Sequence, residues 1–321
     1  SVGGSLWANA PVTELMRHLH LDLVGGLSGD MFIGAVLDVF PVLAEKLDEV
    51  IVAAGFPELV SLACESHNDG TITGTRFSVA AASENSHHHR RYSEIRAKLE
   101  SSNLSGSTRE RALAIFRSIA EVEASIHGKT LENVAFHEVG AWDSIADIVI
   151  AAHLIDVIDA TWSVGPLPLG RGFVGTAHGR LPVPAPATAM LLSGFEVMDD
   201  GIEGERITPT GAAILKHLSP VARLPSGLVL AQTGFGFGTK VFPGIANVVR
   251  VTVFDSIPSS ADWELDQITQ FEFEIDDQTP EQLAQALEAL RQADGVLDVN
   301  QQPTIGKKQR QVSSVSLLVM A

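Results

Sequence analysis

The apolar positions of this chain recur with the period of a helix in some segments and form extended runs in others. A short apolar run, Leu19 to Val24, predicts a buried strand, and the glycine-rich turn after it leads into an apolar helix predicted over residues 30–40. Periodic apolar positions predict further helices at residues 92–100, 108–126, 143–159, 188–192 and 210–218, and extended runs predict strands at residues 133–139 and 248–254. Helices and strands interspersed in this way predict a mixed α/β (α+β) fold.

Two segments interrupt the pattern with glycine and proline. Residues 162–186 end in the run Pro182-Val183-Pro184-Ala185-Pro186, and residues 234–244 are rich in glycine. Because proline fixes φ and removes a backbone donor, while glycine frees the backbone, we expect the first segment to be a long ordered loop or a series of turns and the second to be a loop. The second segment resembles a phosphate-binding loop in composition, but it lacks the spacing of a P-loop.

The C-terminal part of the chain has an order of its own. A strand is predicted at residues 268–275, a helix at 279–293, and strands at 296–299 and 312–320. A ferredoxin-like unit has a further helix and strand, so this βαββ order predicts a truncated unit of that type. We therefore divide the chain into a disordered leader at residues 1–17, a metal and substrate domain at 18–255, a linker at 256–266 and a partial ferredoxin-like domain at 267–321.

Composition narrows the class of protein. Hydrophobic residues make up 45% of the 321 residues, which is enough for a sizeable core and excludes global disorder. The net charge of −17 disfavours nucleic acid as a partner and suits cations. The single cysteine, Cys64, excludes an intramolecular disulfide and a thiolate metal cluster. Without a signal peptide or an apolar run of about 20 residues, we expect a cytoplasmic protein with no membrane partner.

The first group of candidate functional residues surrounds the turn Gly25-Gly26-Leu27-Ser28-Gly29. A glycine-rich turn that feeds a helix presents backbone N–H groups to an anion, so Ser28 and Gly29 are candidate phosphate or carboxylate contacts. Asp22 and Asp30 flank the turn and would bind a metal or water between them and the anion. The alternative is ordinary helix capping by Ser28 with an acid in the first turn.

A second group lies between His137 and Asp147. His137 and Glu138 end an extended segment, and Asp143 and Asp147 are four residues apart on one predicted helix face. Imidazole together with carboxylates suits nickel, zinc, iron, manganese or cobalt. The alternative is a capping box formed by Ser144 and Asp147.

Other polar residues lie in the predicted loops. His87, His88 and His89 form a histidine-rich segment that can recruit divalent metals or can simply be solvated. Candidate contacts to an anionic ligand are Arg171, His178, Thr208, Thr210 and Lys240. An arginine on a rigid Gly-Pro backbone suits capture of a carboxylate or phosphate, although single polar residues in loops are usually solvated.

Several blocks occur together and in a fixed order. They are Asp22 with Leu27 to Phe32, the histidine-rich segment with Arg91-Tyr92, Phe136 to Val149, Pro166 to Gly170, Ala177 to Gly179, Val183 to Thr188, Thr208 to Ala212, Gly238 to Asn247 and Ile275 to Glu281. Through these blocks the chain resembles the LarC-type nickel insertion proteins over about residues 19–310. Many blocks in one order are more specific than any single motif.

This resemblance implies a nickel chelatase of the lyase class that acts in nickel-pincer cofactor biosynthesis. Its substrate would be a pyridinium mononucleotide with two thiocarboxylates, and CTP with manganese or magnesium would take part. We expect a homo-oligomer. For this reaction we assign catalytic roles to Asp22, Asp30 and Glu138, and nickel binding to His137, Glu138, Asp143 and Asp147 with the histidine-rich segment. The alternatives are a nickel storage or delivery protein without catalysis and a metal-dependent phosphohydrolase.

Overall fold

The computed structural model describes residues 17–56, 60–81, 90–136, 139–176, 179–256 and 268–320. The chain divides into two compact units, residues 1–258 and 259–321. Residues 1–16 of the predicted leader and residues 257–266 of the predicted linker lie outside the described residues. Both units combine helices with sheets, which confirms the mixed α/β fold class.

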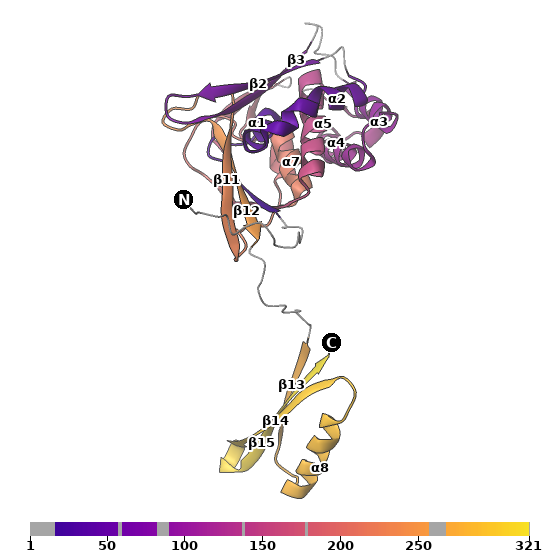
Figure 1. Cartoon of the computed structure of the whole chain (residues 1–321), viewed down its shortest axis with the longest axis vertical. Helices are drawn as coiled ribbons and strands as arrows, with labels where there is room; N and C mark the ends of the chain where they lie inside the picture. The colour runs from indigo at the N-terminus through magenta and orange to yellow at the C-terminus, as the bar shows by residue number, and fades with distance from the viewer. Residues whose placement is uncertain are drawn as a thin grey trace, which may run out of the picture. The chain divides into compact units, whose positions relative to one another are not determined.

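A six-stranded sheet forms one layer of the first unit (Figure 1). In spatial order its strands are β2 (Val60–Asn68), β3 (Thr73–Ala81), β11 (Leu228–Phe237), β12 (Val248–Ser256), β1 (Arg17–Asp22) and β6 (Thr161–Val164). Strand β1 is antiparallel to β12 and parallel to β6. Leu19 and Leu21 of β1 are fully buried, as the apolar run predicts, because alternate side chains of a strand point to the same face.

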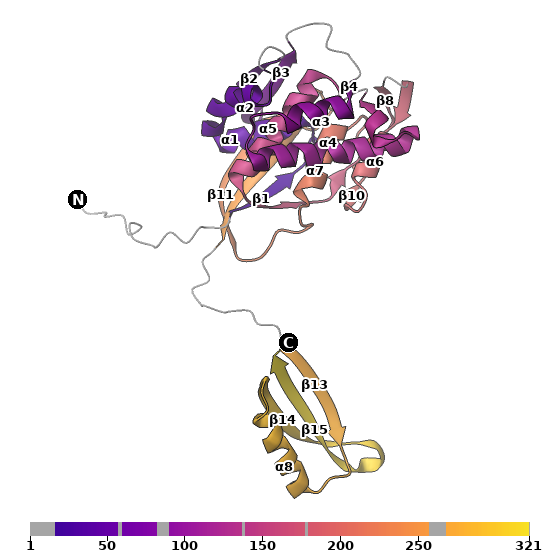
Figure 2. The same cartoon turned by 90° about the vertical axis from the view of Figure 1, so that its right-hand side faces the viewer.

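Helices pack on the sheet and on one another (Figure 2). They are α1 (Gly29–Val39), α2 (Leu47–Ala53), α3 (Tyr92–Glu100), α4 (Gly106–His127), α5 (Trp142–Ile158), α6 (Pro186–Leu191) and α7 (Pro209–Leu218), with a 3-10 turn at Pro41–Lys46. Helix α1 lies against β3 and β11, and α5 packs against both α1 and α4. Most of α5 is buried, so this helix forms the centre of the helical layer.

The glycines of the second predicted loop serve helix packing. Residues 234–237 belong to strand β11, so the loop prediction was wrong for this part. A Cβ atom added at Gly236 would lie 2.1 Å from the carbonyl oxygen of Met31 in α1. Glycine is therefore required where the helix backbone approaches the strand closely. The resulting glycine-rich sequence has the composition of a loop although it forms a strand.

The predicted proline-rich loop also contains short strands. Strand β7 (Leu167–Pro168) pairs with β10 (Val197–Met198), and β8 (Phe173–Thr176) forms a hairpin with β9 (Gly179–Pro182). The prediction of a long ordered loop or a series of turns did not include these strands, because proline is tolerated in short strands at a sheet edge.

Outside this segment, strand β4 (Arg90–Arg91) pairs with β5 (Ala135–Phe136).

The second unit has the predicted order of strand, helix, strand and strand. Its elements are β13 (Ile268–Ile275), α8 (Pro280–Arg291), β14 (Val296–Ile305) and β15 (Gln311–Met320). The antiparallel sheet has the order β13-β15-β14, and α8 packs Leu283 and Leu287 against Val299 and Val315. Within the described ranges, no helix combines the length and the apolar character that a bilayer span requires.

Candidate functional site

The turn after β1 is joined to the segment before α7 by backbone hydrogen bonds. The N–H of Leu27 donates to the carbonyl of Arg206 at 2.8 Å, and the N–H of Thr208 donates to the carbonyl of Leu27 at 2.9 Å. Gly26 has φ +117°, and a Cβ there would lie 1.8 Å from the carbonyl oxygen of Arg206. Only glycine fits this contact. The starts of α1 and α7 are thereby brought together although they are far apart in sequence.

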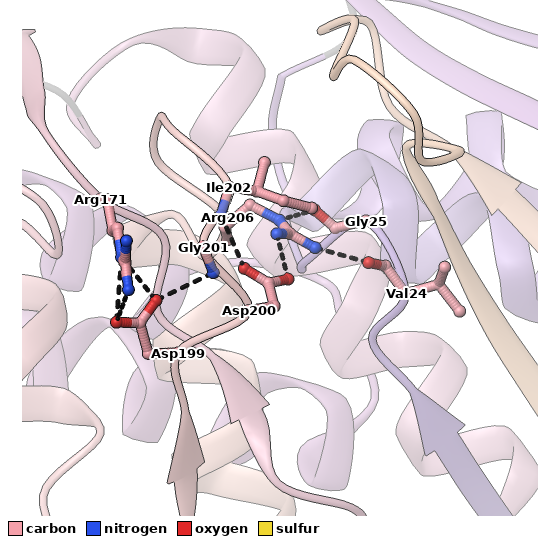
Figure 3. Close-up of polar contacts among 8 residues, drawn as sticks. All are labelled: Val24, Gly25, Arg171, Asp199, Asp200, Gly201, Ile202 and Arg206. Atoms are coloured by element: carbon pink, nitrogen blue, oxygen red, sulfur yellow. Dashed lines mark hydrogen bonds and ion pairs between the residues drawn. The ribbon is translucent and has the colours of Figure 1, made fainter.

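Arg206 fixes the same turn from inside the protein (Figure 3). Its guanidinium is fully buried and donates to the carbonyls of Val24 and Gly25 at 2.6 and 2.8 Å. A third donation, at 2.5 Å, reaches the carboxylate of Asp200. Because buried backbone carbonyls need partners, this arginine determines the position of the turn that leads to α1.

An acidic hollow of about 240 Å³ lies where these segments meet the start of α5. It is lined by Ser28, Gly29, Asp30, Val139, Ser144, Asp147, Glu205, Thr208, Pro209 and Thr210. Three of these side chains are carboxylic acids and four are hydroxyls, so the lining consists mainly of the oxygen donors that divalent cations bind.

Asp30 and Asp147 influence each other in the acidic hollow. Burial raises the pKa of Asp30, while hydrogen bonds from the hydroxyl of Ser28 and from the backbone oppose the rise. The pKa of Asp147 is raised well above its ordinary value by burial first, and then by the charges of Asp30 and Asp143. Asp147 as a residue keeps some exposed surface, but its Oδ1 atom is covered and has no hydrogen-bond partner within the described part of the chain. A cation between the two carboxylates would offset their desolvation and repulsion.

Asp156, on the same helix, is a carboxylate that has several hydrogen-bond donors, in contrast to Asp147. Its oxygen accepts hydrogen bonds from the hydroxyls of Ser105, Ser107 and Thr108 at 3.2, 2.7 and 2.8 Å. These donors and Arg111 lower the pKa of Asp156 although burial opposes them. Among the described residues, Asp147 has no such shell of side-chain donors. A strongly perturbed carboxylate in a hollow is a candidate functional group.

A basic hollow, also of about 240 Å³, adjoins the acidic one. The two share Ser28, Asp30, Glu205 and Thr208, and the basic hollow adds Met31, Arg206, Gly238, Thr239, Lys240, Phe242 and Asn247. The ammonium of Lys240 lies 5.3 Å from the centre of the Phe242 ring. Within the described ranges, no carboxylate pairs with this ammonium. It is therefore available to an anion.

Most of the predicted residues near the turn meet in these hollows. Ser28, Gly29, Asp30, Asp147, Thr208 and Thr210 line the acidic hollow, and Lys240 lines the basic one. The hydroxyl of Ser28 donates to Asp30 and does not cap α1, whereas the hydroxyl of Thr208 caps α7 by accepting from the N–H of Gly211 at 3.2 Å.

Three predicted residues lie elsewhere. Asp22 forms an ion pair with Arg250 at 2.8 Å and lines neither hollow. Arg171 donates two hydrogen bonds through Nε, at 2.8 and 2.9 Å, and one through Nη2, at 2.6 Å, to the carboxylate of Asp199 (Figure 3). Asp143 is exposed and accepts from the N–H of Ser144 at 2.7 Å.

The remaining predicted residues lie outside the described ranges. They are His87, His88, His89, His137, Glu138 and His178. Val139, which directly follows Glu138 in the chain, lines the acidic hollow. The described residues contain no cluster of three or more histidine, cysteine or acidic side chains arranged to hold a metal ion.

Sequence reasoning missed Glu205 and Arg206. Glu205 lines both hollows, and Arg206 holds the turn. Both residues directly precede Ile207 and the predicted helix start Thr208-Pro209-Thr210, which was the signal available in the sequence. Their roles depend on the contact between residues 25–27 and residues 206–208, which no local pattern reveals.

Two desolvated carboxylates, beside an ammonium that has no carboxylate partner among the described residues, suit a protein that handles a divalent cation together with an anionic molecule. Residues 19–321 match the family model described as "Nickel insertion protein". The chain belongs to this family of nickel insertion proteins.

Individual relatives agree with the family model. A "Putative nickel insertion protein" of Citrifermentans bemidjiense is 40% identical over 312 residues, which cover 94% of this chain and 77% of the relative. One of Geotalea uraniireducens, with the same description, is 42% identical over 306 residues, covering 94% and 76%. One of Rhodopirellula baltica is 38% identical over 308 residues, covering 95% and 77%. No solved structure matches the chain.

Proposed function

We propose that this protein inserts nickel into a small anionic molecule within the two adjoining hollows. Asp30 and Asp147 hold Ni²⁺ at the acidic end, and Lys240 holds an anionic group of the acceptor molecule at the basic end. The observation that carries the proposal is the covered Oδ1 atom of Asp147, which has no partner, beside a second desolvated carboxylate.

The donor chemistry suits release as well as binding. Carboxylate and hydroxyl oxygens hold a borderline cation less firmly than thiolates do, so an acceptor with sulfur donors can remove nickel from them. Ser28 and Thr208 line both hollows and so lie at the junction of the two ends. An acceptor anchored at Lys240 would therefore present its metal-binding atoms towards Asp30.

The finer assignment is that the acceptor is the pyridinium bis-thiocarboxylate mononucleotide. Its phosphate and thiocarboxylates are anionic, which suits Lys240 and the turn before α1. Participation of CTP with manganese or magnesium is part of this proposal and rests on the resemblance of the sequence alone. His137 and Glu138 remain predicted nickel ligands, and their position next to Val139 in the chain supports this prediction.

Formation of the nickel-bound chromophore from Ni²⁺ and the metal-free pyridinium compound tests the proposal. The unchanged chain should form the chromophore, and the variant Asp30→Asn should form little or none. The matched control is Asp159→Asn, which removes one charge at the end of α5, where φ is +43° and asparagine is tolerated. Nickel binding without chromophore formation would favour storage or delivery, and phosphate release from generic nucleotides without a nickel preference would favour a phosphohydrolase.

A further inference from the structure

A chain of polar side chains crosses from β6 to β1, away from both hollows. The imidazole of His18 contacts the hydroxyls of Thr161 (Nδ1, 2.8 Å) and Ser163 (Nε2, 2.7 Å). The hydroxyl of Ser163 also contacts Nδ1 of His20 at 2.7 Å. His20 Nε2 then faces Oδ1 of Asp22 at 3.5 Å. These contacts connect five side chains in one continuous series.

Access to solvent increases along this series. His18 and Ser163 are buried, with 3% and 0% of their surface exposed. The side chains of His20 and Asp22 are 18% and 29% exposed. A group from solution can therefore reach the end formed by His20 and Asp22 but not the buried centre.

The series is not a serine nucleophile with its base. Ser163, His20 and Asp22 have the residue types of a hydrolytic triad, but the hydroxyl of Ser163 is enclosed and shared with a second imidazole. A nucleophile must be reachable by its substrate. The arrangement therefore has a different use.

The distance between His20 and Asp22 is informative. At 3.5 Å, Nε2 and Oδ1 are farther apart than a normal N–H···O hydrogen bond of about 2.7–3.2 Å. Two ligands about 2.1 Å from one metal at the tetrahedral angle are separated by roughly 3.4 Å. The separation of these two atoms therefore matches that of two ligands on one borderline divalent cation. The other oxygen of Asp22 keeps its ion pair with Arg250 at 2.8 Å.

We propose that His20 Nε2 and Asp22 Oδ1 form a shallow site for a borderline divalent cation such as Ni²⁺ or Zn²⁺, completed by water. The site lies at the end of β1, directly before the turn that leads to the acidic hollow. The proposed site depends on the geometry of β1 and β6 and not on the hollows. A failure of the proposed nickel insertion would therefore not contradict it.

The buried part of the series supplies the outer shell of this site. A metal at Nε2 of His20 requires the proton of that ring to be on Nδ1, from which it donates to Ser163. The hydroxyl of Ser163 then donates to Nε2 of His18, whose Nδ1–H donates to Thr161. We assign the opposite directions to the metal-free protein, because the nearby charge of Asp22 favours the proton on Nε2 of His20, which leaves Nδ1 to accept from Ser163. Cation binding therefore reverses the tautomers of both His20 and His18.

Nuclear magnetic resonance of the imidazole nitrogens tests this inference on the full chain, with Zn²⁺ as a diamagnetic probe. Resonances are assigned with His18→Gln and His20→Gln. On saturable addition of Zn²⁺, Nε2 of the buried His18 should change from the protonated to the unprotonated type, although the metal does not touch it. The variant Asp22→Asn should reduce this response several-fold, because a neutral amide oxygen is a much weaker ligand than a carboxylate.

A matched control is His67→Gln. His67 contacts Arg76 at 2.9 Å on β2 and β3 and takes no part in the series, so its loss should leave the response of His18 unchanged. The inference is overturned if Zn²⁺ shifts other histidines but neither His18 nor His20. It is also overturned if His20 responds while the tautomer of His18 stays constant, or if Asp22→Asn leaves the response unaltered.

Discussion

Replacement of Asp147 by asparagine separates the stability of this protein from its proposed function. The change keeps the shape of the side chain and removes the charge from a carboxylate whose Oδ1 atom is covered and unpartnered. Burial and the charges of Asp30 and Asp143 disfavour that charge in the metal-free protein. We therefore expect Asp147→Asn to make the metal-free protein more stable and to weaken nickel binding.

The magnitude follows from the cost of a covered, charged oxygen that has no hydrogen-bond partner among the described residues. An unsatisfied buried polar atom costs about 1–3 kcal/mol, and more if it is charged. We expect the free energy of unfolding at pH 8 to rise by about 1–3 kcal/mol. For a domain of roughly 150–250 residues, each kcal/mol shifts Tm by about 2–4 °C, so the variant should melt roughly 2–12 °C higher. Its nickel affinity should fall more than tenfold, which is a loss above about 1.4 kcal/mol.

The gain in stability should depend on pH in a defined direction. The pKa of Asp147 in the folded protein lies above its ordinary value of 3.8, so the folded protein takes up this proton at a higher pH than the unfolded chain. The stability that comes from this proton is present at low pH and is lost as the pH rises through the folded-state pKa. The advantage of Asp147→Asn should therefore be largest at pH 8 and should shrink towards pH 4.

Calorimetric melting of the metal-free proteins from pH 4 to 8, with a nickel titration at pH 8, measures both effects. Asp159→Asn serves as the control and should change neither the melting temperature by more than a degree or two nor the affinity. An Asp147→Asn protein that melts lower at pH 8, or that binds nickel as tightly as the unchanged chain, would refute the reasoning.

Other changes address the packing and the two ends of the site. Gly236→Ala should lower the free energy of unfolding by about 3 kcal/mol in urea, since its Cβ would lie 2.1 Å from a helix carbonyl. Arg206→Met should cost about 1–3 kcal/mol by the same measurement, because two backbone carbonyls and the partly exposed carboxylate of Asp200 lose their buried donor. Lys240→Met should raise the KM for the anionic acceptor at least several-fold while calorimetry finds nickel affinity unchanged. Burial lowers the pKa of His217, so its contribution to stability is lost as the pH falls below about 6.5, and His217→Gln should flatten that part of the stability curve.

Local pattern was sufficient to predict the elements that build the site. Helix α1, the start of α7 and helix α5 agree with their predicted ranges within one or two residues at each end. Apolar periodicity and capping residues are local properties, which explains this agreement. The same reasoning failed at Gly234 and Gly236, where glycine is required because helix α1, which is distant in sequence, packs closely against the strand.

The grouping of residues in space could be predicted only in part. Local motifs predicted both Asp30 and Asp147 as site residues. The effect of the charge of Asp30 on the pKa of Asp147 depends on the packing of α5 against α1. Asp22 was expected beside Asp30, yet the strand directs it to His20 and Arg250. Alternation along β1 separates its polar side chains from the apolar core, and sequence motifs do not show which face meets a hollow.

The role of Arg171 illustrates the same limit. Its setting between two glycines suits capture of an anion, and it does hold a carboxylate, but that carboxylate is Asp199 of the same protein. Lys240 has no such partner within the described part of the chain and faces the basic hollow. We therefore favour Lys240 as the contact for the acceptor molecule.

Diffraction from nickel-loaded crystals, collected on both sides of the nickel absorption edge, tests the central claim most directly. The account predicts an anomalous peak in the acidic hollow within about 2.0–2.2 Å of carboxylate oxygens of both Asp30 and Asp147. Nickel found only outside that hollow, with the Oδ1 atom of Asp147 still unpartnered, would contradict it.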